Sequence, residues 1–129
     1  MDELESFRTT KPDVAQLREQ YPELSDLLNG EFLDKPNVYE LPQGVVVSWT
    51  LNRSTTGKNP TYGRIPNGHF EFPTDHTEEV TVLRGALEAE VEERKGTFNR
   101  GQTVIAPPNS LLKLDVRGAP VYYFCQYKQ

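Results

Sequence analysis

The segment Glu78-Glu79-Val80-Thr81-Val82-Leu83-Arg84-Gly85-Ala86-Leu87 decides the fold predicted for this chain. It has the apolar and β-branched composition of a buried strand, begins with two carboxylates and ends at a glycine turn. A second segment, Gly101-Gln102-Thr103-Val104-Ile105-Ala106-Pro107-Pro108-Asn109-Ser110, has a composition suited to pair with it. We expect both segments to be strands of one β-barrel.

The sequence on both sides of these segments also predicts strands. Residues 87–92 alternate strictly, with Leu, Ala and Val on one face and three Glu on the other, as in a half-buried strand. Further strands are predicted at 45–51, 62–65, 69–72, 103–106, 111–116 and 121–127. Short strands separated by Gly and Pro turns are typical of a β-sandwich or a closed barrel.

The residues before position 31 have a different pattern. Residues 1–11 are polar, and we expect a poorly ordered lead-in there. Residues 12–28 predict two short helices, with Pro22 ending the first and Asn29-Gly30 ending the second. We therefore expect an N-terminal helical extension at 1–30 and a barrel domain at 31–129. The leucine stripe of the extension would pack on the outside of the barrel or on a partner chain.

Composition narrows the class of protein. The chain has 129 residues, enough for one domain with a single core. Its net charge of −5 argues against a nucleic-acid binder, which needs a basic surface to neutralise phosphates. Cys125 is the single cysteine, so no intrachain disulfide can form. We find no secretory signal and no apolar run long enough for a membrane span, and we expect a cytoplasmic protein.

The order of strands resembles the cupin barrel. Cupins carry a first motif that ends in Glu, six residues and Gly, and a second motif that begins with Gly, five residues and Pro. Glu78 and Gly85 have the first spacing, and Gly101 and Pro107 have the second. The resemblance implies an all-β fold, a cupin-like double-stranded β-barrel (jelly roll), with a short N-terminal helical extension.

The histidines of the cupin motifs are missing from this chain. The two first-motif positions fall on Phe72 and Thr74, and the second-motif position falls on Leu112. Of four ligands, only the carboxylate of Glu78 remains, whereas a metal site needs three or four converging N or O ligands. We therefore expect no metal, and a barrel mouth that is free to bind an organic molecule.

Residues from about 37 to 127 resemble, more specifically, the pyrimidine/purine nucleoside phosphorylase family of small cupins with one barrel. Five segments carry this resemblance, in order: Ser54-Thr55-Thr56-Gly57-Lys58, Gly68-x-Phe70-x-Phe72-x-Thr74, Glu78-Glu79-Val80-Thr81-Val82-x-x-Gly85-Ala86-Leu87, Gly101-x5-Pro107-x-x-Ser110 and Tyr123-x-Cys125-x-Tyr127. Two positions depart from the family pattern: Lys58 stands where Arg is expected, and Arg84 replaces a smaller residue. The helical extension lies outside the pattern.

The resemblance implies an enzyme, a metal-independent pentosyltransferase. Nucleoside and phosphate would react to give free base and α-ribose 1-phosphate, with broad tolerance for the base. The family is expected to act without a metal or organic cofactor, as a homodimer, on small-molecule substrates. Such a reaction needs a phosphate cradle, a clamp on the ribose hydroxyls and a slot for the base, all held together.

The hydroxyl-rich segment is the candidate phosphate cradle. Ser54, Thr55 and Thr56 supply hydroxyl donors, Gly57 gives a flexible backbone with free N–H groups, and Lys58 adds one cation. A plain polar hairpin loop is the alternative interpretation of the same residues.

Carboxylates are the candidates for the ribose clamp. Glu78 is the catalytic candidate, and Glu79 and Glu71 are further substrate-binding candidates. Alternation along a strand lets only one of Glu78 and Glu79 point into the barrel, and the cupin register favours Glu78. A surface position is the alternative for Glu71.

Aromatic residues are the candidates for the base slot, because stacking tolerates any base. Phe70, Phe72, Tyr123 and Tyr127 are suitable, and we favour Phe72 and Tyr123. Barrel core is the alternative for each of them. Cys125 fits a small buried apolar residue better than a nucleophile, because no cation or histidine adjoins it in the sequence.

Two other functions fit the same sequence. One is a non-catalytic, metal-free cupin that binds a small ligand or serves as an oligomeric partner. The other is a metal-dependent cupin oxygenase or isomerase, which would need ligands that the motifs do not supply.

Overall fold

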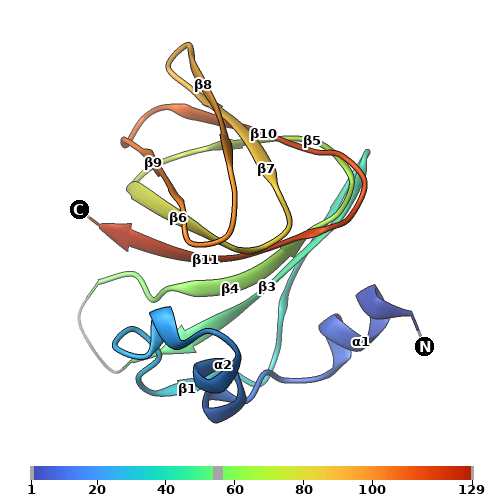
Figure 1. Cartoon of the computed structure of the whole chain (residues 1–129), viewed down its shortest axis with the longest axis vertical. Helices are drawn as coiled ribbons and strands as arrows, with labels where there is room; N and C mark the ends of the chain where they lie inside the picture. The colour runs from blue at the N-terminus through green and yellow to red at the C-terminus, as the bar shows by residue number, and fades with distance from the viewer. Residues whose placement is uncertain (1, 54–56, 129) are drawn as a thin grey trace.

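Two antiparallel sheets form the body of the molecule in the computed structural model, which describes residues 2–53 and 57–128 (Figure 1). The larger sheet has seven strands: β1 (Glu31–Phe32), β2 (Asn37–Leu41), β3 (Gly44–Asn52), β4 (Thr61–Ile65), β6 (Thr77–Arg84), β9 (Thr103–Ala106) and β11 (Val121–Lys128). The smaller sheet has four: β5 (Gly68–Pro73), β7 (Leu87–Val91), β8 (Arg94–Phe98) and β10 (Leu111–Val116). The two sheets face each other as a jelly roll, which confirms the predicted fold class.

The two segments that decided the predicted fold lie side by side. β6 pairs with β9, with Glu78 opposite Ala106 and Thr81 opposite Thr103. On its other side β6 pairs with β11, where Glu78 is opposite Tyr127. β6 is therefore a central strand of the larger sheet, as its apolar, β-branched sequence predicted.

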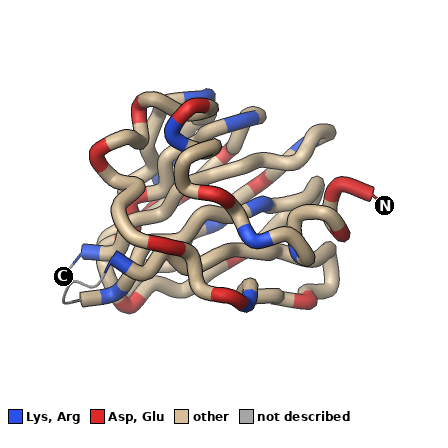
Figure 2. Tube along the Cα trace, turned by 90° about the horizontal axis from the view of Figure 1, so that it is seen from below, with Lys and Arg blue, Asp and Glu red and all other residues tan. Residues whose placement is uncertain are grey.

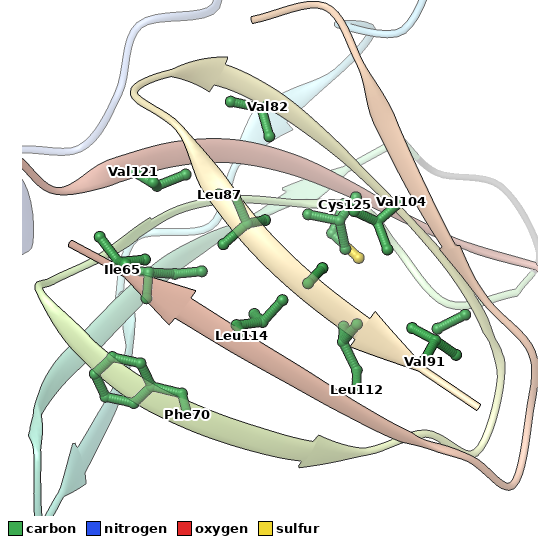
Figure 3. Packing of buried hydrophobic residues seen from close by; sticks show 14 of the residues in the cluster. Ile65, Phe70, Val82, Leu87, Val91, Val104, Leu112, Leu114, Val121 and Cys125 are labelled. Atoms are coloured by element: carbon green, nitrogen blue, oxygen red, sulfur yellow. The ribbon is translucent and has the colours of Figure 1, made fainter. Parts of the chain in front are cut away.

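Alternating side chains of both sheets fill the barrel. On β6, Val80 and Val82 point inward and are buried. Leu112 and Leu114 of β10 meet them from the smaller sheet, and Figure 3 shows these leucines pointing into the same interior as Cys125. Because side chains alternate with a period of two, the residues between them lie on the outer faces of the sheets.

Two helices and a 3₁₀ turn precede the barrel: α1 (Glu3–Thr9), α2 (Val14–Gln20) and η1 (Pro22–Leu24). The expectation of a poorly ordered lead-in at residues 1–11 is wrong. The Asp2 side chain caps α1 by accepting from the Glu5 N–H, and Trp49 Nε1 donates to the Phe7 carbonyl at 2.9 Å. The Asp2 cap is local, but the contact with Trp49 comes from the barrel, so the short polar sequence of α1 does not reveal it.

The extension packs on the outer face of the larger sheet. Its buried apolar residues are Leu17, Tyr21, Leu24 and Leu28. They contact a barrel surface made of Phe32, Trp49, Leu51, Tyr62, Leu83, Tyr122 and Phe124. The leucine stripe therefore packs on the outside of the barrel, which is one of its two predicted positions.

The sequence patterns missed three strands, β1, β2 and β8. β1 and β2 each pair with β3 alone, and β8 pairs with β7 alone, so all three lie at sheet edges. Residues of edge strands are largely exposed and need no apolar alternation, which removes the signal that reveals central strands.

Charges are mixed over the surface. Basic and acidic residues are interspersed along the described trace (Figure 2), as expected for a chain of modest negative charge. Among the described residues, no helix has the length and apolar character that crossing a bilayer requires.

The packing of the extension can be tested at Leu28, whose side chain is fully buried. We expect Leu28→Ala to lower the free energy of unfolding by about 2–5 kcal/mol, because it removes buried methyl groups and leaves a cavity. Leu33→Ala is the matched control, since Leu33 is 45% exposed, and should change stability by less than about 0.5 kcal/mol. Chemical denaturation measures both, and equal effects would contradict the packing described.

Candidate functional site

A cavity of about 190 Å³ opens between the inner faces of the two sheets. Its walls come from β2, β3, β4, β5, β6, β10 and β11 and from Lys58. The lining residues are Tyr39, Val46, Ser48, Lys58, Ile65, Phe72, Pro73, Glu78, Val80, Leu112, Leu114, Tyr123, Cys125 and Tyr127. Most of this wall is aliphatic or aromatic, so the few polar groups in it can orient a ligand.

Glu78 is the carboxylate in the cavity wall. It is half-buried at the start of β6, on the same face as Val80. Burial raises the pKa of Glu78 above its ordinary value, and the nearby Lys58 acts in the opposite direction. The Sγ of Cys125 lies 4.0 Å from Glu78 Oε1. Glu78 is thus a partly desolvated acid whose charge depends on its neighbours.

Lys58 reaches the same end of the cavity. Its Nζ lies 4.2 Å from the centroid of the Tyr127 ring, a cation–π arrangement. The Tyr127 hydroxyl shares a hydrogen bond of 3.2 Å with Thr61 Oγ1, which fixes the ring. Burial raises the pKa of Tyr127, so this hydroxyl stays protonated at neutral pH. A cation and a carboxylate therefore stand beside each other at one end of the wall.

Tyr123 crosses the sheet to reach β3. Gly63 is opposite both Tyr123 and Ser48, so these three residues form one row across β11, β4 and β3. A Cβ on Gly63 would lie 2.4 Å from Cζ of Tyr123, so only glycine leaves room for the ring. The Tyr123 hydroxyl interacts with Ser48, and Asn37 Nδ2 donates to Ser48 Oγ at 3.1 Å. This row holds the Tyr123 ring in the cavity wall.

Cys125 also lines the cavity, but its chemistry is restricted. Burial first, and the charge of Glu78 second, raise the pKa of the Cys125 thiol to about 12. The thiolate is the nucleophilic form of cysteine, and it is scarce at neutral pH for such a group. Cys125 therefore belongs to the wall as a small apolar residue.

The structure brings together five of the candidate site residues singled out in the sequence. Glu78, Lys58, Phe72, Tyr123 and Tyr127 all line the cavity. Gly57 is exposed and is not part of the lining. The remaining residues of the predicted phosphate cradle, Ser54, Thr55 and Thr56, lie outside the described residues.

The structure places the other two carboxylate candidates elsewhere. Glu79 follows Glu78 on β6 and points to the opposite face, where it pairs with Lys128 at 3.2 Å. Glu71 precedes Phe72 on β5 and accepts from His69 at 2.7 Å on the outer face of the smaller sheet. In both cases the neighbouring residue faces the cavity, so alternation sends these carboxylates away from it.

Tyr39 and Ser48 line the cavity but were not singled out in the sequence. Tyr39 lies on β2, the edge strand that the patterns missed. Ser48 lies on β3, in a run that the sequence predicted as a strand. The hydroxyl of Ser48 between Val47 and Trp49 was a usable signal, whereas nothing local distinguished Tyr39.

The residues at the cupin metal positions do not fit a metal. Phe72, Glu78 and Leu112 meet at the cavity, and together they offer one carboxylate. Thr74 Oγ1 instead donates to the Pro107 carbonyl at 2.6 Å, a bond that joins two loops. Nowhere in residues 2–53 and 57–128 do three His, Cys, Asp or Glu side chains gather as metal ligands would.

A larger hollow of about 640 Å³ lies between the edge strands β8 and β9, apart from these groups. Its cations are Arg94 and Lys95, which face Glu92 at 3.9 Å and Glu90 at 3.7 Å, respectively. Both cations are highly exposed, so they exert weak fields. The smaller cavity is the better candidate site because its carboxylate is partly desolvated and shares the wall with a cation and aromatic rings.

A protein-family model matches most of the chain. The model of the pyrimidine/purine nucleoside phosphorylase family matches residues 35–127. A pyrimidine/purine nucleoside phosphorylase of Edwardsiella ictaluri is 32% identical over 93 residues, which are 70% of this chain and 96% of that protein. The protein of the same name from Aeromonas hydrophila is 33% identical over 73 residues, 55% of this chain and 77% of its own length.

Solved structures are similar over the same region. A protein of unknown function (DUF1255) from Acinetobacter sp. ADP1 has a TM-score of 0.66 and 25% identity, over 75% of this chain and 92% of the other. A predicted oxalate decarboxylase from Thermotoga maritima has a TM-score of 0.60 at 10% identity, over 72% and 90% of the two chains. This second likeness concerns the fold alone.

The cluster around Glu71 generates a prediction about pH. His69 Nδ1 contacts Asp115 Oδ1 at 2.8 Å while Nε2 contacts Glu71, and these bonds, that to Glu71 first, raise the pKa of His69 above 6.5. A raised folded-state pKa adds stability that is complete below pH 6.5 and is lost as pH rises through the folded value.

We therefore expect His69→Gln to lower the melting temperature more at pH 6 than at pH 8, by a small amount because the cluster is half exposed. Thermal unfolding followed by circular dichroism at both pH values measures this. An equal loss at both pH values would show that the charged form of His69 adds no stability.

Proposed function

We propose, from the premise that this chain belongs to the pyrimidine/purine nucleoside phosphorylase family, that it catalyses the phosphorolysis of purine and pyrimidine nucleosides. The products are the free base and α-ribose 1-phosphate. One observation carries the proposal: Glu78 and Lys58 line the same cavity as the rings of Phe72 and Tyr123. An acid, a cation and aromatic walls are the groups that ribose, phosphate and base require, respectively.

The reaction transfers a pentosyl group between two nucleophiles. An oxygen of hydrogen phosphate forms a bond to C1′ as the bond from C1′ to the base nitrogen breaks. The electron pair of that bond stays on the base, and the proton of hydrogen phosphate balances it. Positive charge develops on C1′ and the ring oxygen in the transition state, as in glycoside hydrolysis.

Glu78 has two roles in this proposal. Its ionised carboxylate accepts hydrogen bonds from vicinal ribose hydroxyls, which fixes the sugar. The same negative charge stabilises the developing cation, and it does so strongly because the surrounding wall is apolar.

Lys58 is the proposed phosphate-binding cation. In the free protein its ammonium group rests on the Tyr127 ring at 4.2 Å. A phosphate dianion offers a stronger partner than a ring face, so phosphate would draw Lys58 from the ring. We propose that Ser54, Thr55, Thr56 and Gly57 complete the phosphate cradle, as the family resemblance implies.

Family membership supports three further proposals. We propose that the chain needs neither a metal nor an organic cofactor, because the donor set at the cavity is one carboxylate. We also propose that it acts as a homodimer and in the cytoplasm. Light scattering on the purified protein tests the dimer, and fractionation of cells tests the cytoplasmic location.

The reaction is tested directly with purified protein and Glu78→Gln. We expect the natural sequence to release base from uridine and adenosine only when phosphate is present. Glu78→Gln keeps the shape of the side chain but removes its charge, so kcat should fall by on the order of 100-fold. Chromatography measures the release of base and of ribose 1-phosphate by both proteins.

Glu79→Gln is the matched control, since Glu79 neighbours Glu78 on β6 but pairs with Lys128 outside the cavity. It should retain the activity of the natural sequence. Loss in Glu79→Gln alone would reverse the assignment of the two carboxylates. Nucleoside binding without any phosphate-dependent release would instead favour a non-catalytic, metal-free cupin that binds a small ligand.

Lys58→Ala should weaken the binding of phosphate more than the binding of nucleoside. Because one charge-assisted contact is lost, we expect KM for phosphate to rise by about tenfold and KM for uridine to change less. Lys128→Ala removes a cation from the outer face and should leave both constants unchanged. Initial rates with one substrate varied at a time separate the constants, and an unchanged KM for phosphate would remove Lys58 from the site.

A further inference from the structure

We infer that Tyr39 holds the base of a bound nucleoside at the mouth of the cavity, an inference that rests on the proposed function. Tyr39 lies on the edge strand β2, opposite Val46 of β3. Directly opposite residues point to the same face of a sheet. Val46 is buried in the barrel, so Tyr39 faces the cavity too, while its side chain is 49% exposed.

The cavity is too small to enclose a nucleoside together with phosphate. Pockets that enclose a ligand measure roughly 300–1,000 Å³, whereas this cavity measures about 190 Å³. A nucleoside with phosphate therefore cannot be enclosed completely. The part that extends beyond the cavity meets whichever lining residue is exposed at the mouth.

The order of strands in the larger sheet determines how a bound nucleoside is oriented in the cavity. The acid Glu78 lies on β6, and β11, β4 and β3 separate that strand from β2. Ribose and phosphate held by Glu78 and Lys58 occupy one end of the cavity. The base then extends along Tyr123, in the middle of the wall, toward Tyr39 at the other end.

The chemistry of this aromatic end favours stacking over hydrogen bonding. The neighbours Val46 and Ile65 are aliphatic, and the hydroxyls of Ser48 and Tyr123 already interact with each other. The ring of Tyr39 is a large apolar surface left half in water, and a flat base would cover it. Stacking strength grows with the area of the base, so Tyr39 should favour purine over pyrimidine nucleosides.

Tyr39→Ala tests this inference in the intact protein. We expect KM for adenosine to rise by on the order of tenfold and KM for uridine by less, because stacking on the larger base is lost. Stacking is equal in the ground state and the transition state, so kcat should stay within about twofold. KM for phosphate should not change.

Two variants on the same strand serve as controls. Tyr39→Phe keeps the ring and should keep the affinity for adenosine. Val38→Ala alters the opposite face of β2, where Val38 is 36% exposed, and should have no effect on either substrate. Thermal unfolding of all three variants separates a lost contact from a lost fold.

The outcomes distinguish this inference from the proposed function. Phosphorolysis by the natural sequence with unchanged KM values in Tyr39→Ala overturns the role of Tyr39 and leaves the reaction standing. Calorimetric titration with adenosine, without phosphate, measures binding alone. Binding that weakens in Tyr39→Ala, in a protein that releases no base, supports Tyr39 and overturns the reaction. Absence of both binding and release overturns both.

Discussion

Burial of both faces of the larger sheet is the constraint on which the rest of the structure depends. Its inner face closes the barrel, and its outer face carries large apolar side chains such as Trp49 and Phe124. An apolar surface of that size in water would be costly, so a second layer must cover it. The N-terminal extension supplies this layer with Leu24 and Leu28. Because packing on the outer face also stabilises the fold, the inner face can carry polar groups at one end.

One glycine sets the shape of the cavity wall. The ring of Tyr123 lies over Gly63, where any larger residue would displace it. A tyrosine that crosses a strand in this way reaches Ser48, and its ring becomes a flat surface in the wall rather than a plug in the core. The cavity lies beside this ring and is bounded by aliphatic residues of both sheets.

Local periodicity predicted the central strands, whereas the direction of Glu78 also needed the cupin register, because alternation alone leaves Glu78 and Glu79 equivalent. Alternation places Glu78 toward the barrel and Glu79 away from it, and the same rule sends Glu71 outward beside an inward Phe72. Helix α1 could not be predicted so readily, since a contact distant in sequence holds it to the barrel. The edge strand β2 forms a hairpin with β3, but its exposed residues lack the apolar alternation that marks central strands. Tyr39 was missed for that reason.

The replacement of imidazoles by apolar side chains changes what the remaining carboxylate can do. In a metal site Glu78 would be neutralised by the ion, whereas here Phe72 and Leu112 stand beside it and withhold solvent. The raised pKa of Glu78 records the cost of that desolvation, which Lys58 offsets in part. A carboxylate kept in an apolar wall attracts a nearby positive charge more strongly than one in water, because the local dielectric is low. In the proposed reaction, the charge that completes this site is transient, on the sugar, so the arrangement suits stabilisation of a cationic transition state better than tight binding of a neutral ground state.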